Sequence, residues 1–267
     1  MAGADEQASI PEAHRIARLV RPTPEEFFEQ YYLPERPVII EGALHDWPCQ
    51  RWSVAHLRDR IGARKHVFHY EDDRQLEMTV AEYLDVAFGD GSMAFPDVPS
   101  ATERRPYMRH FGPLEGDFEA EYPIASLFPA RDDLRFLSYL FCGVPATKTN
   151  CHFDWSHNFV GVVRGQKHVT LLPPGAEQFM TLDDETRKVM GRGNCEHFAD
   201  PPSLRLDRGP LGPGESRMHE HPILGSCPEL YYAPLHAGDL VFFPAYWYHY
   251  FHNVEASVTV TTQSRRV

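Results

Sequence analysis

From about Leu134 to its last residue, the sequence is a series of short segments rich in β-branched and aromatic residues, separated by Gly and Pro. Such segments are typical of β-strands, and Gly and Pro are typical of the turns between strands. The segments are Phe136–Leu140, Phe159–Val163, His168–Leu172, Leu230–Ala233, Leu240–Phe243 and Ser257–Thr262. This pattern predicts a mainly β core built as a sandwich or barrel.

The part of the chain before this series has the signals of helices mixed with short strands. Thr23 and Thr79 each precede a glutamate by three residues, the spacing of a helix capping box, and Ser53 opens a third helix that ends at Gly62. With 267 residues, one domain is the simplest organisation. We expect a flexible segment over 1–20 and a single domain over 21–267. The domain has a lead-in over about 21–133 and a β core over about 134–267, interrupted by a loop insertion over about 176–228.

The composition excludes several classes of protein. Apolar residues make up 42% and charged residues 24%, as in ordinary globular proteins. No apolar run is long enough to cross a membrane, so we expect a cytoplasmic protein without a membrane partner. The net charge of −12 opposes direct binding to nucleic acid. That charge either favours a neutral or basic partner or only keeps the protein soluble.

The triplet His152-Phe153-Asp154 is the first candidate for a metal site. Residues two apart on an extended strand share a face, so both side chains could converge on one ion. Downstream, the segment from Gly238 reads as a turn, an apolar strand, a proline and an aromatic cluster that delivers His249. Two imidazoles and one carboxylate form the facial set of non-haem iron(II) oxygenases, which leaves metal positions open for other ligands.

Three other groups compete with this assignment. His69-Tyr70-Glu71 has the same alternation, but no aromatic, proline and histidine element follows it at a comparable distance. His219-Glu220-His221 could bind a divalent ion, although it lies in the insertion that is rich in Gly and Pro. His252 follows the same aromatic strand as His249, three residues further on.

These motifs resemble the Jumonji C (JmjC) family of cupin-like oxygenases, which depend on iron(II) and 2-oxoglutarate. Within the family, the sequence is most similar to the small protein hydroxylases typified by the asparaginyl hydroxylase of hypoxia-inducible factor. The resemblance spans roughly residues 24 to 262 and is weakest over 176–228. Its strongest pieces are Thr149–Phe159, Gly165–Lys167, Leu172–Pro174 and Gly238–His249.

The resemblance implies a double-stranded β-helix, a jelly-roll of the cupin type, and a set of site residues. It assigns His152, Asp154 and His249 to the metal, and Lys167 to the distal carboxylate of 2-oxoglutarate. In addition, it implies that Thr149 and Tyr107 donate hydroxyls to that carboxylate and that Asn158 lies near the co-substrate or the oxygen-binding position. The last core strand of the relatives often carries asparagine or tryptophan. Here the corresponding segment is Thr259–Gln263, and Thr261 is the expected contact.

The activity implied by the resemblance is hydroxylation of a C–H bond with O2, coupled to decarboxylation of 2-oxoglutarate to succinate. We expect the C–H bond to lie on a peptide or protein side chain. The alternatives are an oxygenase for a free small molecule or in natural-product biosynthesis, an N-methyl demethylase, a cupin with another metal, and a non-catalytic cupin-like binding module.

Overall fold

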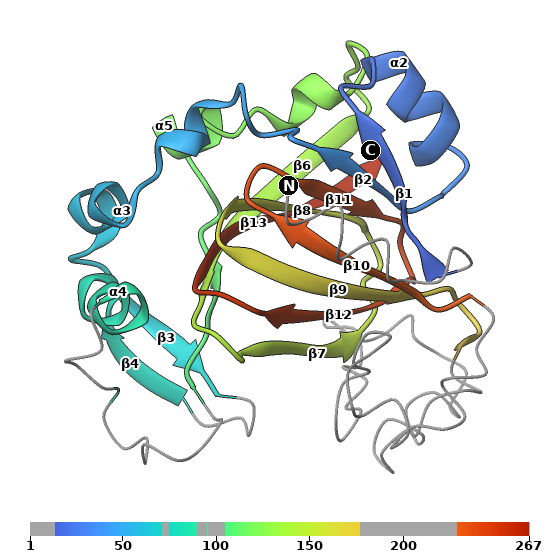
Figure 1. Ribbon diagram of the computed structural model, residues 1–267. Helices are drawn as coiled ribbons and strands as arrows, with labels where there is room; N and C mark the ends of the chain where they lie inside the picture. The colour runs from blue at the N-terminus through green and yellow to red at the C-terminus, as the bar shows by residue number, and fades with distance from the viewer. Residues whose placement is uncertain (1–13, 71–74, 90–94, 96–104, 177–228, 267) are drawn as a thin grey trace.

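The computed structural model describes residues 14–70, 75–89, 95, 105–176 and 229–266 (Figure 1). Most of its strands form two sheets. In spatial order, the larger sheet contains β1 (Ala17–Val20), β2 (Val38–Glu41), β11 (Leu240–Phe243), β8 (His157–Arg164), β13 (Ser257–Arg266), β6 (Leu134–Gly143) and β5 (Met108–Phe111). The smaller sheet contains β10 (Tyr231–His236), β9 (Gln166–Leu172), β12 (Tyr248–Asn253) and β7 (Lys148–His152).

Strands that follow one another in the sequence mostly lie in opposite sheets. From β6 to β9 and again from β10 to β13, the chain alternates between the two sheets, and the pairs within these core strands are antiparallel. This winding produces the order β6-β13-β8-β11 in one sheet and β7-β12-β9-β10 in the other. The arrangement is a double-stranded β-helix, so the predicted fold class is confirmed.

Both faces of the larger sheet are buried. Its inner face packs against the smaller sheet through apolar residues such as Val160 and Val162. Its outer face carries residues such as Phe159 and Phe242, which pack against Phe27 from the lead-in. Strands buried on both faces appear in a sequence as continuous apolar runs, which is why these segments could be recognised.

The lead-in folds as short helices and one hairpin along the outer side of the larger sheet (Figure 1). These elements are α2 (Pro24–Phe27), the π-helix η2 (Phe28–Tyr32), the 3-10 helices η3 (Pro48–Arg51) and η4 (Ile124–Leu127), α3 (Val54–Ile61), α4 (Val80–Phe88), α5 (Asp117–Ala120), and the hairpin of β3 (Lys65–His69) and β4 (Gln75–Thr79). Thr79 forms the complete capping box with Glu82. Thr23 and Ser53 cap their helices by accepting a backbone N–H.

The prediction of a flexible segment over 1–20 is wrong for its last residues. Ala17–Val20 form β1, which pairs in parallel with β2. Ile16 is buried in the core between the two sheets, and Arg18 forms an ion pair with Glu41 at 3.0 Å. Apolar burial and this ion pair attach the segment to the sheet edge. Residues 1–13 lie outside the described residues, as does nearly all of the predicted insertion over 176–228.

Two strands that carry the candidate ligands, β7 and β12, were not among the predicted strand segments. Both are rich in polar and aromatic side chains, because one of their faces lines a cavity. Among the helices of the described residues, none is both long and apolar enough to cross a membrane.

Candidate metal centre

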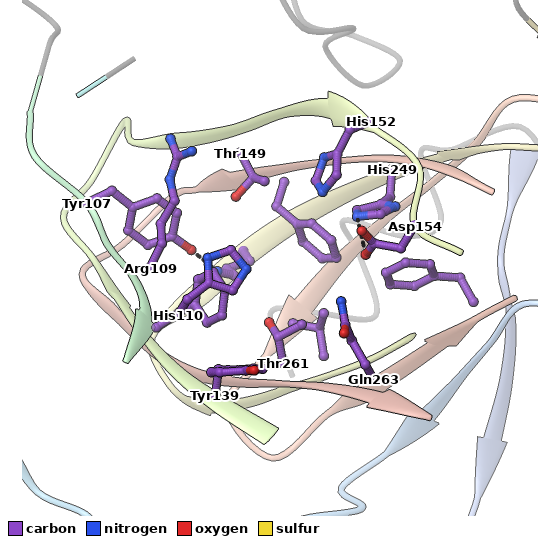
Figure 2. A pocket seen from close by; sticks show the side chains of 15 residues that line it. Tyr107, Arg109, His110, Tyr139, Thr149, His152, Asp154, His249, Thr261 and Gln263 are labelled. Atoms are coloured by element: carbon purple, nitrogen blue, oxygen red, sulfur yellow. Dashed lines mark hydrogen bonds and ion pairs between the residues drawn. The ribbon is translucent and has the colours of Figure 1, made fainter. Parts of the chain in front are cut away.

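His152, Asp154 and His249 lie together on the wall of a cavity (Figure 2). His152 is the last residue of β7, and His249 is directly opposite it on β12, with 4.1 Å between the ring centroids. One ligand atom from each of the three residues lies within 4.8 Å of the others. Within the described part of the chain, no other group of three such side chains is close enough to hold a metal.

Asp154 reaches this group from a loop. The sequence predicted that it shares a strand face with His152, but β7 ends at His152 and Asp154 follows in the connection to β8. Its Oδ2 still lies 3.7 Å from Nε2 of His249. A carboxylate just beyond the end of a strand can turn toward the histidine on the neighbouring strand. The regular alternation of side chains on a straight strand does not predict this position.

The ring of His249 is prepared for a metal by its surroundings. Its Nδ1 lies 3.1 Å from the carbonyl oxygen of Trp247, so Nδ1–H donates there and Nε2 keeps its lone pair. Burial lowers the pKa of His249 to about 3, and the nearby His152 contributes to the lowering while Asp154 opposes it. The ring is therefore neutral near pH 7, the form that binds metals.

Asp154 is held from two sides. Asn158 Nδ2 donates to Asp154 Oδ2 at 2.9 Å, and the backbone N–H of Tyr246 donates to the carbonyl oxygen of Asp154 at 2.7 Å. The N–H of Ala245 also donates to Nδ1 of His157 at 3.0 Å. The bond of Tyr246 joins the loop after β7 to the loop before β12, and the bonds of Asn158 and His157 tie these loops to β8. The carboxylate and the imidazoles therefore keep a fixed relative position.

Asn158 lies beside Asp154, and its place near the co-substrate or the oxygen-binding position stays a prediction. It is not among the residues that line the cavity, because its amide is directed to Asp154 and to the carbonyl oxygen of Ser156. Its contacts are those of a residue that orients a metal ligand.

The cavity has a volume of about 190 Å³, and Lys167 lies on its wall. The side chain is only 2% exposed, and its Nζ donates to the hydroxyl of Tyr107 at 2.8 Å and to Oγ1 of Thr259 at 3.2 Å. None of the ion pairs formed among the described residues involves Lys167. A buried ammonium bonded only to neutral hydroxyls is costly unless an anion joins it, so this site fits a carboxylate ligand.

The other predicted co-substrate residues, Tyr107, Thr149 and Thr261, line the same cavity. Sequence reasoning missed Thr259, which contacts Lys167, and Gln263, which lines the wall. The alternation along β13 could have found both, because they share a face with Thr261. It also missed Arg109, His110 and Tyr139, for which the sequence carries no regular pattern.

Of the competing histidines, the structure describes His252 and His69, and neither lines this cavity. His252 faces away from the cavity toward His168, with 6.3 Å between the ring centroids, because it is an odd number of residues from His249 on β12. His69 ends β3 beside a separate hollow, and Glu71 lies outside the described residues. His219-Glu220-His221 also lies outside them.

The architecture agrees with that of a known protein family. The model described as a cupin-like domain matches residues 24–262, which is most of the chain. The chain belongs to the cupin-like family. Residues 24–262 of this cupin-like protein contain every candidate ligand and every described strand except β1 and the end of β13.

Curated relatives of this cupin-like protein include JmjC proteins. JmjC domain-containing protein A of Dictyostelium discoideum is 27% identical over 254 residues, which cover 88% of this chain and 90% of that protein. The human bifunctional peptidase and (3S)-lysyl hydroxylase JMJD7 is 24% identical over 271 residues, 90% of this chain and 80% of that protein. Mouse tRNA wybutosine-synthesizing protein 5 is 23% identical over 262 residues, 92% of this chain and 74% of that protein. The predicted JmjC and cupin-like membership is confirmed, whereas the likeness to the asparaginyl hydroxylase stays a prediction.

Proposed function

We propose that this chain is an iron(II)- and 2-oxoglutarate-dependent oxygenase of the JmjC class that hydroxylates a C–H bond. The observation that carries the proposal is a pairing of two features on one cavity wall. The first feature is the set of three metal-ligand candidates. The second is the buried Lys167, which has no carboxylate as an ion-pair partner among the described residues. An iron ion alone would not require the second feature, and an anion alone would not require the first.

Each residue of the site has a stated task in this proposal. His152, Asp154 and His249 would hold the iron at the cavity wall. Lys167, assisted by the hydroxyls of Tyr107 and Thr259, would hold the distal carboxylate of 2-oxoglutarate. When bound, iron and 2-oxoglutarate would supply the oxidation of a C–H bond by O2, coupled to release of succinate and carbon dioxide. The apolar rings of Phe243 and Phe251 line the same cavity and keep water away from that part of it.

The relatives support a peptide or protein as the primary substrate. JMJD7 is described as a (3S)-lysyl hydroxylase, and lysine-specific demethylase 8 of Xenopus tropicalis is 23% identical over 273 residues. Both names describe chemistry on a lysine. Hydroxylation of an N-methyl carbon leads to loss of the methyl group, so hydroxylase and demethylase share one first step.

The decisive experiment is an anaerobic titration of the metal-free protein with iron(II), followed by 2-oxoglutarate. We expect a weak visible charge-transfer band, since the keto acid chelates the metal. Glutarate, which keeps both carboxylates but lacks the keto oxygen, is the matched control and should give no band. Absence of a band with 2-oxoglutarate, although iron is bound, would contradict the proposal.

The substrate class needs a second experiment. The loaded enzyme is incubated in air with cell-extract proteins, and separately with a mixture of free amino acids and other small metabolites. We expect a peptide residue to gain the mass of one oxygen atom or to lose a methyl group. Oxidation of small metabolites only, with peptides inert at saturating co-substrate, would leave the oxygenase assignment intact and replace the substrate class.

A further inference from the structure

Strands β11 and β12 are joined by a tight turn over residues 244–247, close to His249 in the sequence. The N–H of Trp247 donates to the carbonyl oxygen of Pro244 at 3.4 Å, which closes the turn. Tyr246, the third residue of the turn, has φ +66°, a value that turns usually give to glycine or asparagine at this position. A tyrosine there is strained, so contacts with the rest of the protein must hold the turn in this conformation.

Two hydrogen bonds join the turn to metal-ligand candidates. The N–H of Tyr246 donates to the backbone carbonyl oxygen of Asp154 at 2.7 Å, which holds the loop that carries the carboxylate. The carbonyl oxygen of Trp247 accepts from Nδ1–H of His249 at 3.1 Å, which sets the tautomer and orientation of that ring. A displacement of the turn would therefore move two of the three candidates relative to His152.

A third hydrogen bond joins the turn to the first residue of β8. The N–H of Ala245 donates to Nδ1 of His157 at 3.0 Å. Nδ1 can accept only when it carries no proton, so the ring proton is on Nε2, which lies 4.0 Å from Oε1 of Glu35. His249 has the opposite tautomer, with its proton on Nδ1. The turn thus lies between two histidines whose tautomers match its donor on one side and its acceptor on the other.

The ring of His157 is itself held by the core on the outer side of the larger sheet. It packs against Tyr32 and Phe242, with ring centroids 4.8 Å and 5.9 Å away. Burial lowers the pKa of His157, while Glu35 opposes this lowering and Arg266 adds to it. The ring is therefore neutral near pH 7, as an acceptor nitrogen requires.

We propose that His157 is a positioning residue for the metal centre, because its Nδ1 holds the turn that orients His249 and Asp154. His157 is not among the residues that line the cavity, so it acts through the turn and not by contact with a co-substrate. This inference rests on the proposed function, because it takes a metal to be bound at this site. Loss of a residue that orients metal ligands typically lowers metal affinity by about 10- to 100-fold.

The test measures binding of cobalt(II) to the metal-free protein under anaerobic conditions and needs no substrate. Cobalt(II) is a suitable probe because its visible absorption depends on the number and geometry of its ligands. His157→Leu removes the acceptor nitrogen and keeps an apolar side chain in the same place in the core. We expect this variant to bind cobalt(II) about 10- to 100-fold more weakly, with a changed visible spectrum.

Two control variants separate positioning from a general loss of stability. In His157→Asn, Oδ1 is bonded to Cγ as Nδ1 is in histidine, so it can accept the same N–H. This variant should bind cobalt(II) within about threefold of the wild type and show the wild-type spectrum. Leu57→Ala removes buried side-chain volume from the same core cluster, in α3, and leaves the bonds of the turn in place. It should lower stability in urea without changing cobalt(II) binding.

A measurement on the wild type does not depend on how the variants fold. Long-range proton–nitrogen NMR spectra of the metal-free protein near pH 7 report which nitrogen of each imidazole carries the proton. We expect the proton of His157 on Nε2. The signals of this ring are assigned by their absence from the spectrum of His157→Asn.

Several outcomes would overturn the inference. They are unchanged cobalt(II) affinity in His157→Leu, weak binding by a folded His157→Asn, an equal loss of affinity in Leu57→Ala, and a proton on Nδ1 of His157. A missing charge-transfer band in wild-type protein that binds iron(II) would contradict the oxygenase proposal and leave the role of His157 at the metal intact. The two failures are therefore distinguishable.

Discussion

His249 and His252 follow the same aromatic cluster and differ in the face of β12 that they occupy. His249 is buried on the cavity side beside His152, whereas His252 lies on the other face beside His168. The face of β12 that each histidine occupies decides whether its ring can reach a metal bound to Asp154. The neighbouring residues in the sequence do not decide this.

We expect His249→Ala to abolish iron-dependent succinate formation, because the variant lacks one of three ligands. His252→Ala is the matched control, since it removes the same ring from the opposite face of β12 and should largely preserve succinate formation. Succinate is measured after incubation with iron(II), 2-oxoglutarate and O2. Retained turnover in His249→Ala with loss in His252→Ala would reverse the ligand assignment.

Lys167→Ala should weaken 2-oxoglutarate binding by at least about a hundredfold, because removing one partner of a desolvated charge pair costs roughly 3–5 kcal/mol. Tyr107→Phe removes one hydroxyl next to the same ammonium and should have a smaller effect. Iron(II) binding is expected to survive in both variants. Affinities come from the anaerobic titration, and an unchanged affinity in Lys167→Ala would remove this residue from the co-substrate site.

Among the elements, the hairpin of β8 and β9 sets the position of Lys167. Gly165 lies at its turn with φ +77°, and a Cβ there would lie 2.2 Å from the carbonyl oxygen of Ala256. The turn therefore requires glycine for two reasons, a left-handed backbone and a close backbone approach.

Gly165→Ala should lower the free energy of unfolding by roughly 1–3 kcal/mol for the clash in addition to about 1–2 kcal/mol for the left-handed backbone. Gly175→Ala separates the two terms. Its φ is +93°, but nothing lies within 4 Å of the added Cβ, so only the backbone term applies. Urea unfolding of both variants measures the difference. Equal losses of stability would mean that the strand ends move apart to accommodate the Cβ added at Gly165.

For the whole molecule, burial of histidines links stability to pH. Burial is the largest cause that lowers the pKa of His66, His157 and His252, and for His252 the value falls to about 4, with Lys148 and His168 contributing. In the unfolded chain these rings have ordinary pKa values of about 6.5. The unfolded state therefore binds more protons between these values, and folding is favoured above this range.

The free energy of unfolding of the metal-free protein should consequently fall as the pH decreases from about 7 to about 5. His252→Gln removes one of these titrations. As the pH falls over that range, the variant should gain stability relative to the wild type by on the order of 1 kcal/mol. This value is reduced because the ring is partly exposed. Urea unfolding at several pH values measures this difference. A pH-independent difference would show that His252 titrates alike in both states.

The distribution of charge is also a property of the whole molecule. The net charge of −12 suggested a neutral or basic partner, or only solubility. Around the cavity the described residues instead provide Lys167 and Arg109 against the single carboxylate of Asp154. The net charge counts every charged residue equally, whereas the binding of a charged group depends mainly on the charges nearest to it.

Structural features that depend on a few neighbouring residues could be predicted from the amino-acid sequence. β-Branched and aromatic runs marked β8, β9, β11 and β13, and Thr79 with Glu82 marked the start of α4. The family motifs identified candidate ligands that the structure brings together. Such signals are readable because alternation and capping are local properties of a few consecutive residues.

Which distant residues share the cavity depends on how the strands pair and pack in three dimensions. Lys167 meets Tyr107 and Thr259, which are 60 and 92 residues away in the sequence. Arg109 enters the wall through a bulge, and Asn158 turns to Asp154 instead of the cavity. The polar strand β7 and the edge strand β1 form because partner strands accept their backbone hydrogen bonds. Pairing register between strands far apart in the sequence sets these contacts, and a shift of one residue would reverse every side chain.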